Sequence, residues 1–288
     1  LTAAVEYLSP SGTWSTDYLS TLWYNSSAGK WQTNFTPPSA AELGDYDIRT
    51  MVTDTDSDSS SWSTYSDNIT VLNNLPSVTN YSFAANNIIR GQTVLLGLNN
   101  TDTEDSESSH VVSVMYRSPT GDWNNDNLSA VWYNNTANRW ETNFTPPTSS
   151  ELGDYDLRIR VNDTDGGSSG WNTYSDVITV NNNLPSLQNY ALSADEVLRA
   201  NTIVIGANTS DTEDGESSHT VSFKYRSPSG DWSSSALSTP WYSSSNSRWE
   251  TNFTPTTSFE LGDYDLRIRV NDTDGSSSGW NPYSNVIS

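Results

Sequence analysis

Short stretches of alternating apolar and polar residues run along the whole chain, separated by clusters of Gly, Pro, Asn, Asp and Ser. Alternation with a period of two is typical of strands that bury one face, and such clusters are typical of turns. No segment shows the apolar spacing of an amphipathic helix. Within residues 73–181 the pattern predicts seven strands, over residues 77–83, 88–98, 111–117, 128–134, 139–145, 154–161 and 175–181.

The whole pattern repeats with a spacing of 109 residues, which Trp14, Trp123 and Trp232 illustrate. The repeat contains no insertion or deletion, which indicates recent duplication and predicts a longer parent array of like modules. A short linker, Asn-Asn-Leu-Pro, opens each full module. The chain therefore divides into a partial module and two full modules, residues 1–72, 73–181 and 182–288.

Seven short strands in a module of this length predict an all-β fold, a sandwich of two packed sheets. The first module lacks its linker and its first two strands, because Leu1 aligns with His110. A sandwich without two strands exposes unpaired strand edges. Two interpretations follow: the chain is a window from a continuous array, or another subunit donates the missing strands by β-augmentation.

Two motifs resemble known domains. Residues 151–166 read Glu-Leu-Gly-Asp-Tyr-Asp-Leu-Arg-Ile-Arg-Val-Asn-Asp-Thr-Asp-Gly, and residues 260–275 are identical. This segment is similar to the F strand of PKD-like and fibronectin type III-like domains, where a tyrosine hydrogen-bonds back to the chain. Residues 62–66, Trp-Ser-Thr-Tyr-Ser, are similar to the W-S-x-W-S box of some fibronectin type III domains. The resemblance implies tandem immunoglobulin-like sandwiches, of the kind found in archaeal and bacterial surface proteins.

The chain is strongly acidic and rich in large aromatic residues. It carries 35 Asp and Glu against 13 Lys and Arg, together with 12 Trp and 15 Tyr. High net charge with few aliphatic residues is typical of disorder, but the aromatic side chains supply enough apolar surface for a core. The negative charge excludes nucleic acid and anionic membrane surfaces as partners. No apolar run is long enough for membrane insertion.

Two acidic segments recur in each full module and supply candidate metal ligands. Asp-Thr-Glu-Asp-x-Glu lies between the second and third strands, and Asn-Asp-Thr-Asp-Gly follows the sixth. In an immunoglobulin-like sandwich both loops face the preceding module, where the linker also arrives. Because Ca²⁺ takes about six to eight oxygen ligands, these segments predict a calcium site at each junction. The alternative is a solvated acidic rim of turn-forming residues. The candidate ligands are Asp102, Glu104, Asp105, Asp163, Asp165, Asp211, Glu213, Asp214, Asp272 and Asp274.

Twelve Asn-x-Ser/Thr sequons are candidate N-glycosylation sites. Asn-Phe-Thr recurs within a strand whose alternation places Trp140, Thr142 and Phe144 on the core face, and Glu141 and Asn143 on the outer face. An outward Asn can carry a glycan in a secreted protein, and the alternative is an unmodified polar residue. The first candidates are Asn34, Asn143 and Asn252, and the others are Asn25, Asn68, Asn80, Asn99, Asn127, Asn134, Asn162, Asn208 and Asn271.

The four Trp of each module have two interpretations. Exposed, they would form a sugar-binding platform, but their regular placement in or beside strands favours packing roles. Alternation places Asp156, Arg158 and Arg160 on the outer face of the sixth strand, within reach of Trp171, which predicts an Arg–Trp stack. The third module repeats this stack with Arg267, Arg269 and Trp280.

Candidate catalytic groups are scarce. The chain has no Cys, and its only His residues, His110 and His219, each begin a strand and are interpreted as structural. No Gly-rich phosphate loop or nucleophile elbow is present. Carboxylates are plentiful, but they recur with the module rather than in one cleft. The sequence therefore predicts a protein that is not an enzyme.

Together these features predict an extracellular, structural tandem-repeat protein at the cell surface. It would form a rod, a surface layer or a filament, carry N-linked glycans, have calcium-stiffened junctions, and associate with further copies of the same module. The absence of Cys and the presence of only two Lys fit an archaeal exterior. The alternatives are an adhesin or carbohydrate-binding array that uses exposed aromatics, and an accessory repeat region of a larger secreted enzyme.

Overall fold

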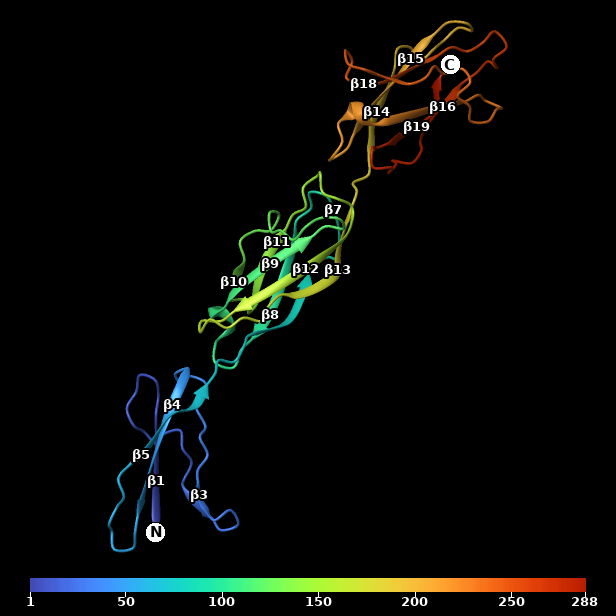
Figure 1. The fold of residues 1–288 in the computed structure, drawn as a ribbon. Coiled ribbons are helices and arrows are strands. Elements are labelled where there is room, and N and C mark those ends of the chain that lie inside the picture. The colour runs from blue at the N-terminus through green and yellow to red at the C-terminus, as the bar shows by residue number, and fades with distance from the viewer.

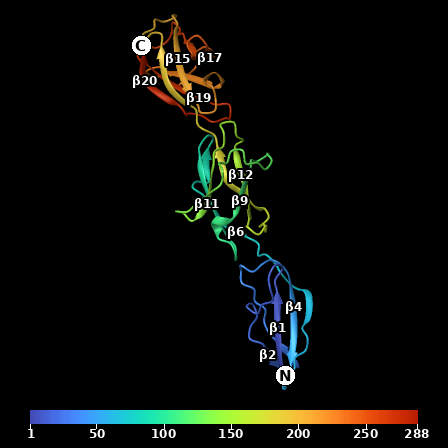
Figure 2. The ribbon, with the colours of Figure 1, turned by 90° about the vertical axis from the view of Figure 1, so that its left-hand side faces the viewer.

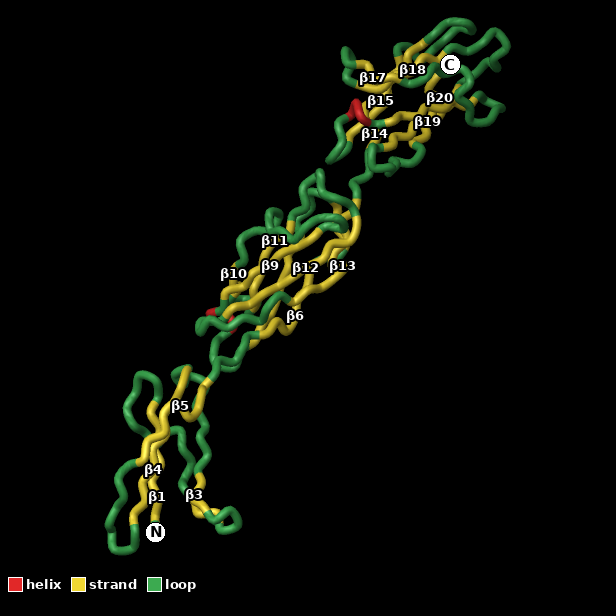
Figure 3. The backbone as a smooth tube through the Cα atoms, viewed as in Figure 1, coloured by secondary structure: helices red, strands yellow, loops and turns green.

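The computed structural model describes all 288 residues, and strands and loops make up almost the whole chain (Figure 3). Three β-rich bodies follow one another end to end, so the molecule is elongated and its termini lie at opposite ends (Figures 1 and 2). The only helices are two single-turn 3-10 helices, η1 (Glu107–Ser109) and η2 (Glu216–Ser218). Neither is long or apolar enough to cross a membrane.

The middle body is a sandwich of two four-stranded sheets. Its strands are β6 (Ser77–Phe83), β7 (Asn87–Ile89), β8 (Val94–Thr101), β9 (Val111–Arg117), β10 (Trp132–Asn134), β11 (Arg139–Phe144), β12 (Gly153–Asn162) and β13 (Asn172–Asn181). One sheet has the order β10-β11-β8-β6 and the other the order β7-β13-β12-β9. Every pair is antiparallel except β7 with β13.

The structure confirms the predicted all-β sandwich but divides one expected strand. Residues 88–98, predicted as a single strand, form β7 and β8, which belong to opposite sheets. Between them Gly91 has a φ of 76°, a backbone conformation that favours glycine. The chain crosses from one sheet to the other at this turn, so the module has eight strands rather than seven. The strand expected over residues 128–134 is also shorter, and begins only at Trp132.

The third body repeats this arrangement. Its strands are β14 (Ser186–Leu192), β15 (Ile203–Ser210), β16 (Thr220–Arg226), β17 (Trp241–Ser243), β18 (Arg248–Phe253), β19 (Tyr264–Asn271) and β20 (Asn281–Ile287). One sheet has the order β14-β15-β18-β17 and the other the order β16-β19-β20. Where β7 would recur, the backbone N–H of Val197 still donates a hydrogen bond of 2.8 Å to the carbonyl oxygen of Ser288.

The first body contains fewer strands. They are β1 (Thr2–Leu8), β2 (Trp23–Asn25), β3 (Lys30–Gln32), β4 (Gly44–Thr53) and β5 (Ser63–Val71), in a three-stranded sheet, β1-β4-β5, and a hairpin, β2-β3. These are the counterparts of β9 to β13, and no counterpart of β6, β7 or β8 is present. Strand β3 therefore pairs with β2 alone, whereas the equivalent β11 pairs with both β10 and β8.

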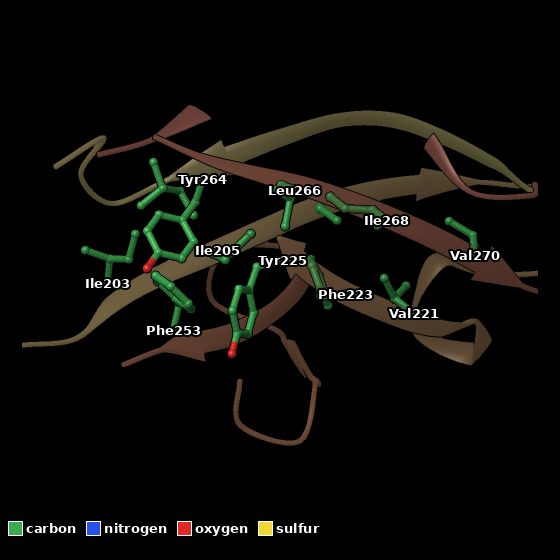
Figure 4. Packing of buried hydrophobic residues seen from close by; sticks show 12 residues of the cluster. Ile203, Ile205, Val221, Phe223, Tyr225, Phe253, Tyr264, Leu266, Ile268 and Val270 are labelled. Carbon is green, nitrogen blue, oxygen red and sulfur yellow. The ribbon is translucent and has the colours of Figure 1, made fainter. Parts of the chain in front are cut away.

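Each full module buries an apolar core between its two sheets. In the third module this core is a cluster of 12 buried residues that includes Phe253, Leu266 and Ile268 (Figure 4). The ring of Phe253 lies 5.0 Å from that of Tyr225 and 6.0 Å from that of Tyr264, measured between centroids. Aromatic rings thus provide much of the buried surface, as the composition indicates.

The tyrosine at the start of β12 makes the corner contact that the resemblance implies. Tyr155 Oη donates a hydrogen bond of 2.7 Å to the carbonyl oxygen of Glu151, and burial raises the pKa of this phenol. The phenol therefore remains a donor at neutral pH. Tyr46 and Tyr264 make the same contact, at 2.8 and 2.6 Å.

Candidate functional site at the module junctions

Three polar segments meet at the N-terminal end of each full module, as the sequence predicts. In the middle module Asn73 Nδ2 donates to Asp163 Oδ2 at 2.8 Å, and the backbone N–H of Asn74 donates to Glu104 Oε1 at 2.8 Å. The linker is thereby bonded to both acidic loops. The third module repeats the two bonds, at 2.8 and 2.9 Å, through Asn182, Asp272, Asn183 and Glu213.

The second acidic loop is a tight turn organised by its first aspartate. Asp163 Oδ1 accepts hydrogen bonds from the backbone N–H groups of Asp165, at 3.0 Å, and Gly167, at 2.6 Å. Thr164 donates its backbone N–H and its hydroxyl to the carboxylate of Asp105, which joins the two acidic loops. These bonds lower the pKa of Asp105. Asp105 and Asp163 therefore have both carboxylate oxygens engaged within the fold.

The first acidic loop leaves carboxylate oxygens without partners. Asp102 Oδ1 accepts from the backbone N–H of Glu104 at 3.0 Å, and Glu104 Oε1 accepts from Asn74. Their other oxygens, Asp102 Oδ2 and Glu104 Oε2, are buried and have no hydrogen-bond partner, and the same is true of Asn73 Oδ1. In the third module the equivalent oxygens are also buried without a partner: Asp211 Oδ2, Glu213 Oε2 and Asn182 Oδ1.

The ten predicted metal ligands are not gathered into one carboxylate cage. No group of three or more His, Cys, Asp or Glu side chains is arranged to hold a metal ion. Four of the ten are bonded through both oxygens within the loops: Asp105, Asp163, Asp214 and Asp272. Two are exposed: Asp165 and Asp274. Four keep an unpartnered buried oxygen: Asp102, Glu104, Asp211 and Glu213.

One arginine joins the middle and third modules. Arg90 follows β7 and places its Nη1 2.5 Å from Asp274 Oδ2 and 3.8 Å from Glu213 Oε1. Its Nε donates to the carbonyl oxygen of Ser150 at 2.7 Å, which holds the side chain against its own module. Its carbonyl oxygen accepts from Asn183 Nδ2 at 3.2 Å. The side chains of Arg90 and Glu213 are only 10% and 5% exposed, so this contact is largely shielded from solvent.

The buried carboxylate pair at this junction is electrostatically unfavourable. Burial raises the pKa of Glu213, the hydrogen bond from Asn183 opposes this effect, and the neighbouring carboxylate of Asp211 adds to it. Two carboxylates in contact cannot both remain ionised without a compensating positive charge or proton. At this junction Arg90 supplies one positive charge beside the two carboxylates.

The outer face of β12 carries the predicted Arg–Trp stack, which is longer than expected. The guanidinium carbon of Arg158 lies 4.8 Å from the ring centroid of Trp123 and 4.4 Å from that of Trp171. Arg117 and Arg160 each cover a further ring face at 4.8 Å. Arg117 and Trp123 were not predicted, because only the pairing of β9 with β12 brings them here. The third module repeats the stack with Arg226, Trp232, Arg267, Trp280 and Arg269.

One Trp in each module stays at the surface. Trp23, Trp132 and Trp241 are 40%, 36% and 37% exposed, on the short strands β2, β10 and β17. By contrast, Trp140 donates its Nε1–H to the carbonyl oxygen of Glu107 at 2.9 Å and packs against the core. Three of the four Trp in the middle module thus have packing roles.

None of the twelve sequon asparagines is buried. Three are exposed: Asn34, Asn68 and Asn80. The others are half-buried: Asn25, Asn99, Asn127, Asn134, Asn143, Asn162, Asn208, Asn252 and Asn271. Five of them donate their side-chain Nδ2–H to other groups: Asn25, Asn99, Asn127, Asn134 and Asn208. The Asn-Phe-Thr asparagines Asn143 and Asn252 lie on β11 and β18 with no such bond.

The expectation that Glu141 points outward is wrong in one respect. Glu141 does lie opposite the core face of β11, but it is only 3% exposed. Arg139 pairs with its carboxylate at 2.8 Å, and Asn134 donates to it at 2.8 Å. These bonds lower the pKa of Glu141. Alternation identified the face of the strand, but not the neighbours that cover it.

The two histidines are buried and lie where each core meets the junction. His110 Nδ1 is 2.5 Å from Asn100 Oδ1, and His219 Nδ1 is 2.7 Å from Thr209 Oγ1. Surface hollows recur beside β1, β9 and β16, and they are lined by apolar residues that include Leu19, Leu128 and Leu237. No acidic-loop residue lines these hollows, so the acids and the hollows lie apart.

No protein-family model matches the chain, and no curated protein sequence matches it. Similar solved structures include the titin domains z1z2 in complex with telethonin, with 9% identity over 76% of this chain and 98% of that chain and a TM-score of 0.37. The Yersinia pseudotuberculosis adhesin InvE has 13% identity over 72% and 60%, and a TM-score of 0.33. The Clostridium thermocellum CbhA fibronectin(III)-like modules have 14% identity over 72% and 94%, and a TM-score of 0.25. The likeness is in the immunoglobulin-like and fibronectin type III-like fold alone.

Proposed function

We propose that this chain is part of an extracellular, non-catalytic tandem-repeat protein whose modules form a rod, the body of a filament or a surface layer. The observation that carries the proposal is the contact of Arg90 with Glu213 and Asp274, which joins consecutive modules. Each full module carries both halves of this contact, because the arginine recurs at Arg199 and the acidic pair at Glu104 and Asp165. The contact can therefore be repeated along a longer array of the same module.

The linker supports the same proposal, because it is short and tied at both ends. Pro76 and Pro185 are buried in the modules that they precede, which anchors the linker there. Asn183 is bonded both to Glu213 ahead and to Arg90 behind. A short proline-containing linker with these contacts restricts bending between modules. The Cys-free, Lys-poor composition favours an archaeal surface as the location.

Replacing Arg90 with Ala is expected to loosen the second junction without unfolding either module. Small-angle scattering from the chain should show a broader distribution of dimensions, because the ion pair that spans the two modules is lost. Each module should stay folded, because Arg90 belongs to neither apolar core. Arg199→Ala is the matched control, since Arg199 bonds only to Phe259 of its own module. Scattering identical to wild type for both variants would remove the main support for a stiff array.

Electron microscopy of the assembly from its native source tests the proposed function itself. A continuous fibre or lattice with one bead per module is the expected result. Short rods attached to a larger body would instead support the adhesin or the accessory region of a secreted enzyme.

The adhesin alternative has one specific observation in its favour. Trp23, Trp132 and Trp241 are exposed at equivalent positions in the three modules. Exposed aromatic rings at a fixed spacing suit multivalent binding to a repetitive carbohydrate. In that case a sugar would have to protect these three Trp from a neutral fluorescence quencher.

We also propose N-linked glycans on the Asn-Phe-Thr sequons, at Asn34, Asn143 and Asn252. Peptides that contain these residues, from protein taken from the native source, are expected to carry a mass increase. The internal control is Asn134, whose side chain bonds to Glu141 and lies beside Arg139. Unmodified masses for all three Asn-Phe-Thr peptides would reject the proposal.

A further inference from the structure

We propose that each full module holds a divalent cation at its N-terminal junction through three side-chain oxygens from an Asn, an Asp and a Glu. In the middle module the ligand atoms are Asn73 Oδ1, Asp102 Oδ2 and Glu104 Oε2. In the third module they are Asn182 Oδ1, Asp211 Oδ2 and Glu213 Oε2. The role of the ion in stiffening the junction rests on the proposed function, but its binding does not.

All three side chains take part in the hydrogen-bond network of the junction. Each uses one polar atom to build the junction: Asn73 donates to Asp163, Asp102 accepts from Glu104, and Glu104 accepts from Asn74. Each leaves its other oxygen buried and without a partner. An unsatisfied buried acceptor destabilises the folded state, and more so when it is charged. Three such oxygens, on residues that hydrogen bonds bring to the same junction, indicate a missing electropositive partner.

Burial and repetition set these oxygens apart from an ordinary acidic surface. The side chain of Glu213 is only 5% exposed, yet its Oε2 has no partner. The same three atoms are left unpartnered in both full modules. A solvated acidic rim, the alternative that the sequence left open, would instead expose its carboxylate oxygens to water. The buried oxygens therefore distinguish this set from the exposed Asp165 and Asp274 nearby.

Neither a shared proton nor a single water molecule would satisfy all three oxygens. A proton shared by Asp102 and Glu104 would satisfy one carboxylate contact but not the amide oxygen of Asn73. A single water molecule donates two hydrogen bonds, so one water cannot satisfy all three oxygens. A divalent cation can be coordinated by all three oxygens, and its charge balances the charges of the two carboxylates. Ca²⁺ suits oxygen ligands at about 2.3–2.6 Å in flexible geometry and completes its shell with water, whereas Mg²⁺ demands near-ideal octahedral geometry.

The two sites are not electrostatically equal. Arg90 Nη1 lies 3.8 Å from Glu213 Oε1 in the third module. No cation of the chain is paired with Glu104 in the middle module. The positive guanidinium repels a bound cation, so the site at Asn73 should fill at a lower Ca²⁺ concentration than the site at Asn182.

The test is a Ca²⁺ titration of the whole chain in 0.15 M salt, followed by calorimetry and by amide NMR. The backbone N–H groups of Asn74 and Asn183 bond directly to Glu104 and Glu213, so each reports one site. Two ions per chain are expected, with dissociation constants on the order of 10⁻⁴ to 10⁻³ M, as in other extracellular modules. Glu104→Gln should abolish the Asn74 response alone, and Glu213→Gln the Asn183 response alone.

The control is Asp165→Asn, which removes one negative charge from the same junction without touching an unpartnered oxygen. Two ions should still bind to this variant. Both Gln variants keep an Oε1 acceptor for the linker amide, so the fold is preserved, and unchanged dispersion of the remaining amide signals verifies this. No Ca²⁺ response, or equal responses in Glu104→Gln and wild type, would overturn the proposal. Scattering without Ca²⁺ tests the rod separately, since a stiff array that binds no ion would leave the proposed function intact.

Discussion

Replacing Phe253 with Ala is expected to lower the free energy of unfolding of the third module by about 3–5 kcal/mol, the usual cost for a buried Phe. Phe253 is fully buried, and its ring packs against Tyr225, Phe259 and Tyr264, at centroid distances of 5.0, 6.2 and 6.0 Å (Figure 4). Tyr225 and Tyr264 lie on neighbouring strands of the opposite sheet, so their rings cannot move to close the space that the side chain leaves. The loss therefore combines transfer of the ring with a residual cavity.

The repeat supplies matched variants for this prediction. Phe144 is equally enclosed in the middle module, so Phe144→Ala should have a similar effect there. Phe35 is only half-buried, because β3 lacks the neighbour that β8 provides to β11, so Phe35→Ala should cost less. Differential scanning calorimetry, with NMR to assign each transition to a module, measures all three. If Phe253→Ala shifted every transition equally, the modules would not be separate folding units.

Replacing Arg158 with Ala is expected to destabilise the middle module by about 1–3 kcal/mol. Its guanidinium lies between two indole rings, and each such contact contributes about 0.5–1 kcal/mol when exposed and up to about 2 kcal/mol when desolvated. Arg158→Lys should recover only part of the loss, because an ammonium keeps the charge but not the planar stacking surface. Chemical denaturation monitored by near-UV circular dichroism reports both stability and the Trp environment.

The control for the Arg158 prediction is Arg117→Ala, at one end of the same stack. Arg117 covers a single ring face, its side chain is 41% exposed, and it pairs with Asp156. An exposed pair of this kind is worth less than about 1 kcal/mol. Equal losses for the two variants would show that sandwiching between two rings adds nothing to stability.

Local sequence patterns were sufficient to predict the fold class and most of the strands. Alternation records which face of a strand is buried, and it correctly placed Phe144 in the core and Arg158 on the outer face. The spacing of 109 residues predicted that the third module would repeat the middle one, and the linker bonds and the Arg–Trp stack do recur. The corner bond of Tyr155 followed from resemblance to other sandwiches.

Tertiary structure decided what alternation cannot record, namely which residues from distant segments become neighbours. Residues 88–98 read as one strand, but a turn at Gly91 sends its two parts to opposite sheets. Strand pairing brought Trp123 onto Arg158, and the covering side chain of Arg139 buried Glu141.

The same distinction applies to the junction. Sequence alone identified the acidic loops and their convergence with the linker, because loop order follows from strand order in a sandwich. It could not separate Asp163, whose oxygens are both bonded, from Glu104, which keeps one oxygen buried and free. Nor did it single out Asn73, whose Oδ1 is also buried and unpartnered, although the repeated Asn-Asn-Leu-Pro motif carries that residue. Which oxygens are satisfied depends on the three-dimensional packing of the two loops against the linker, and no local pattern encodes it.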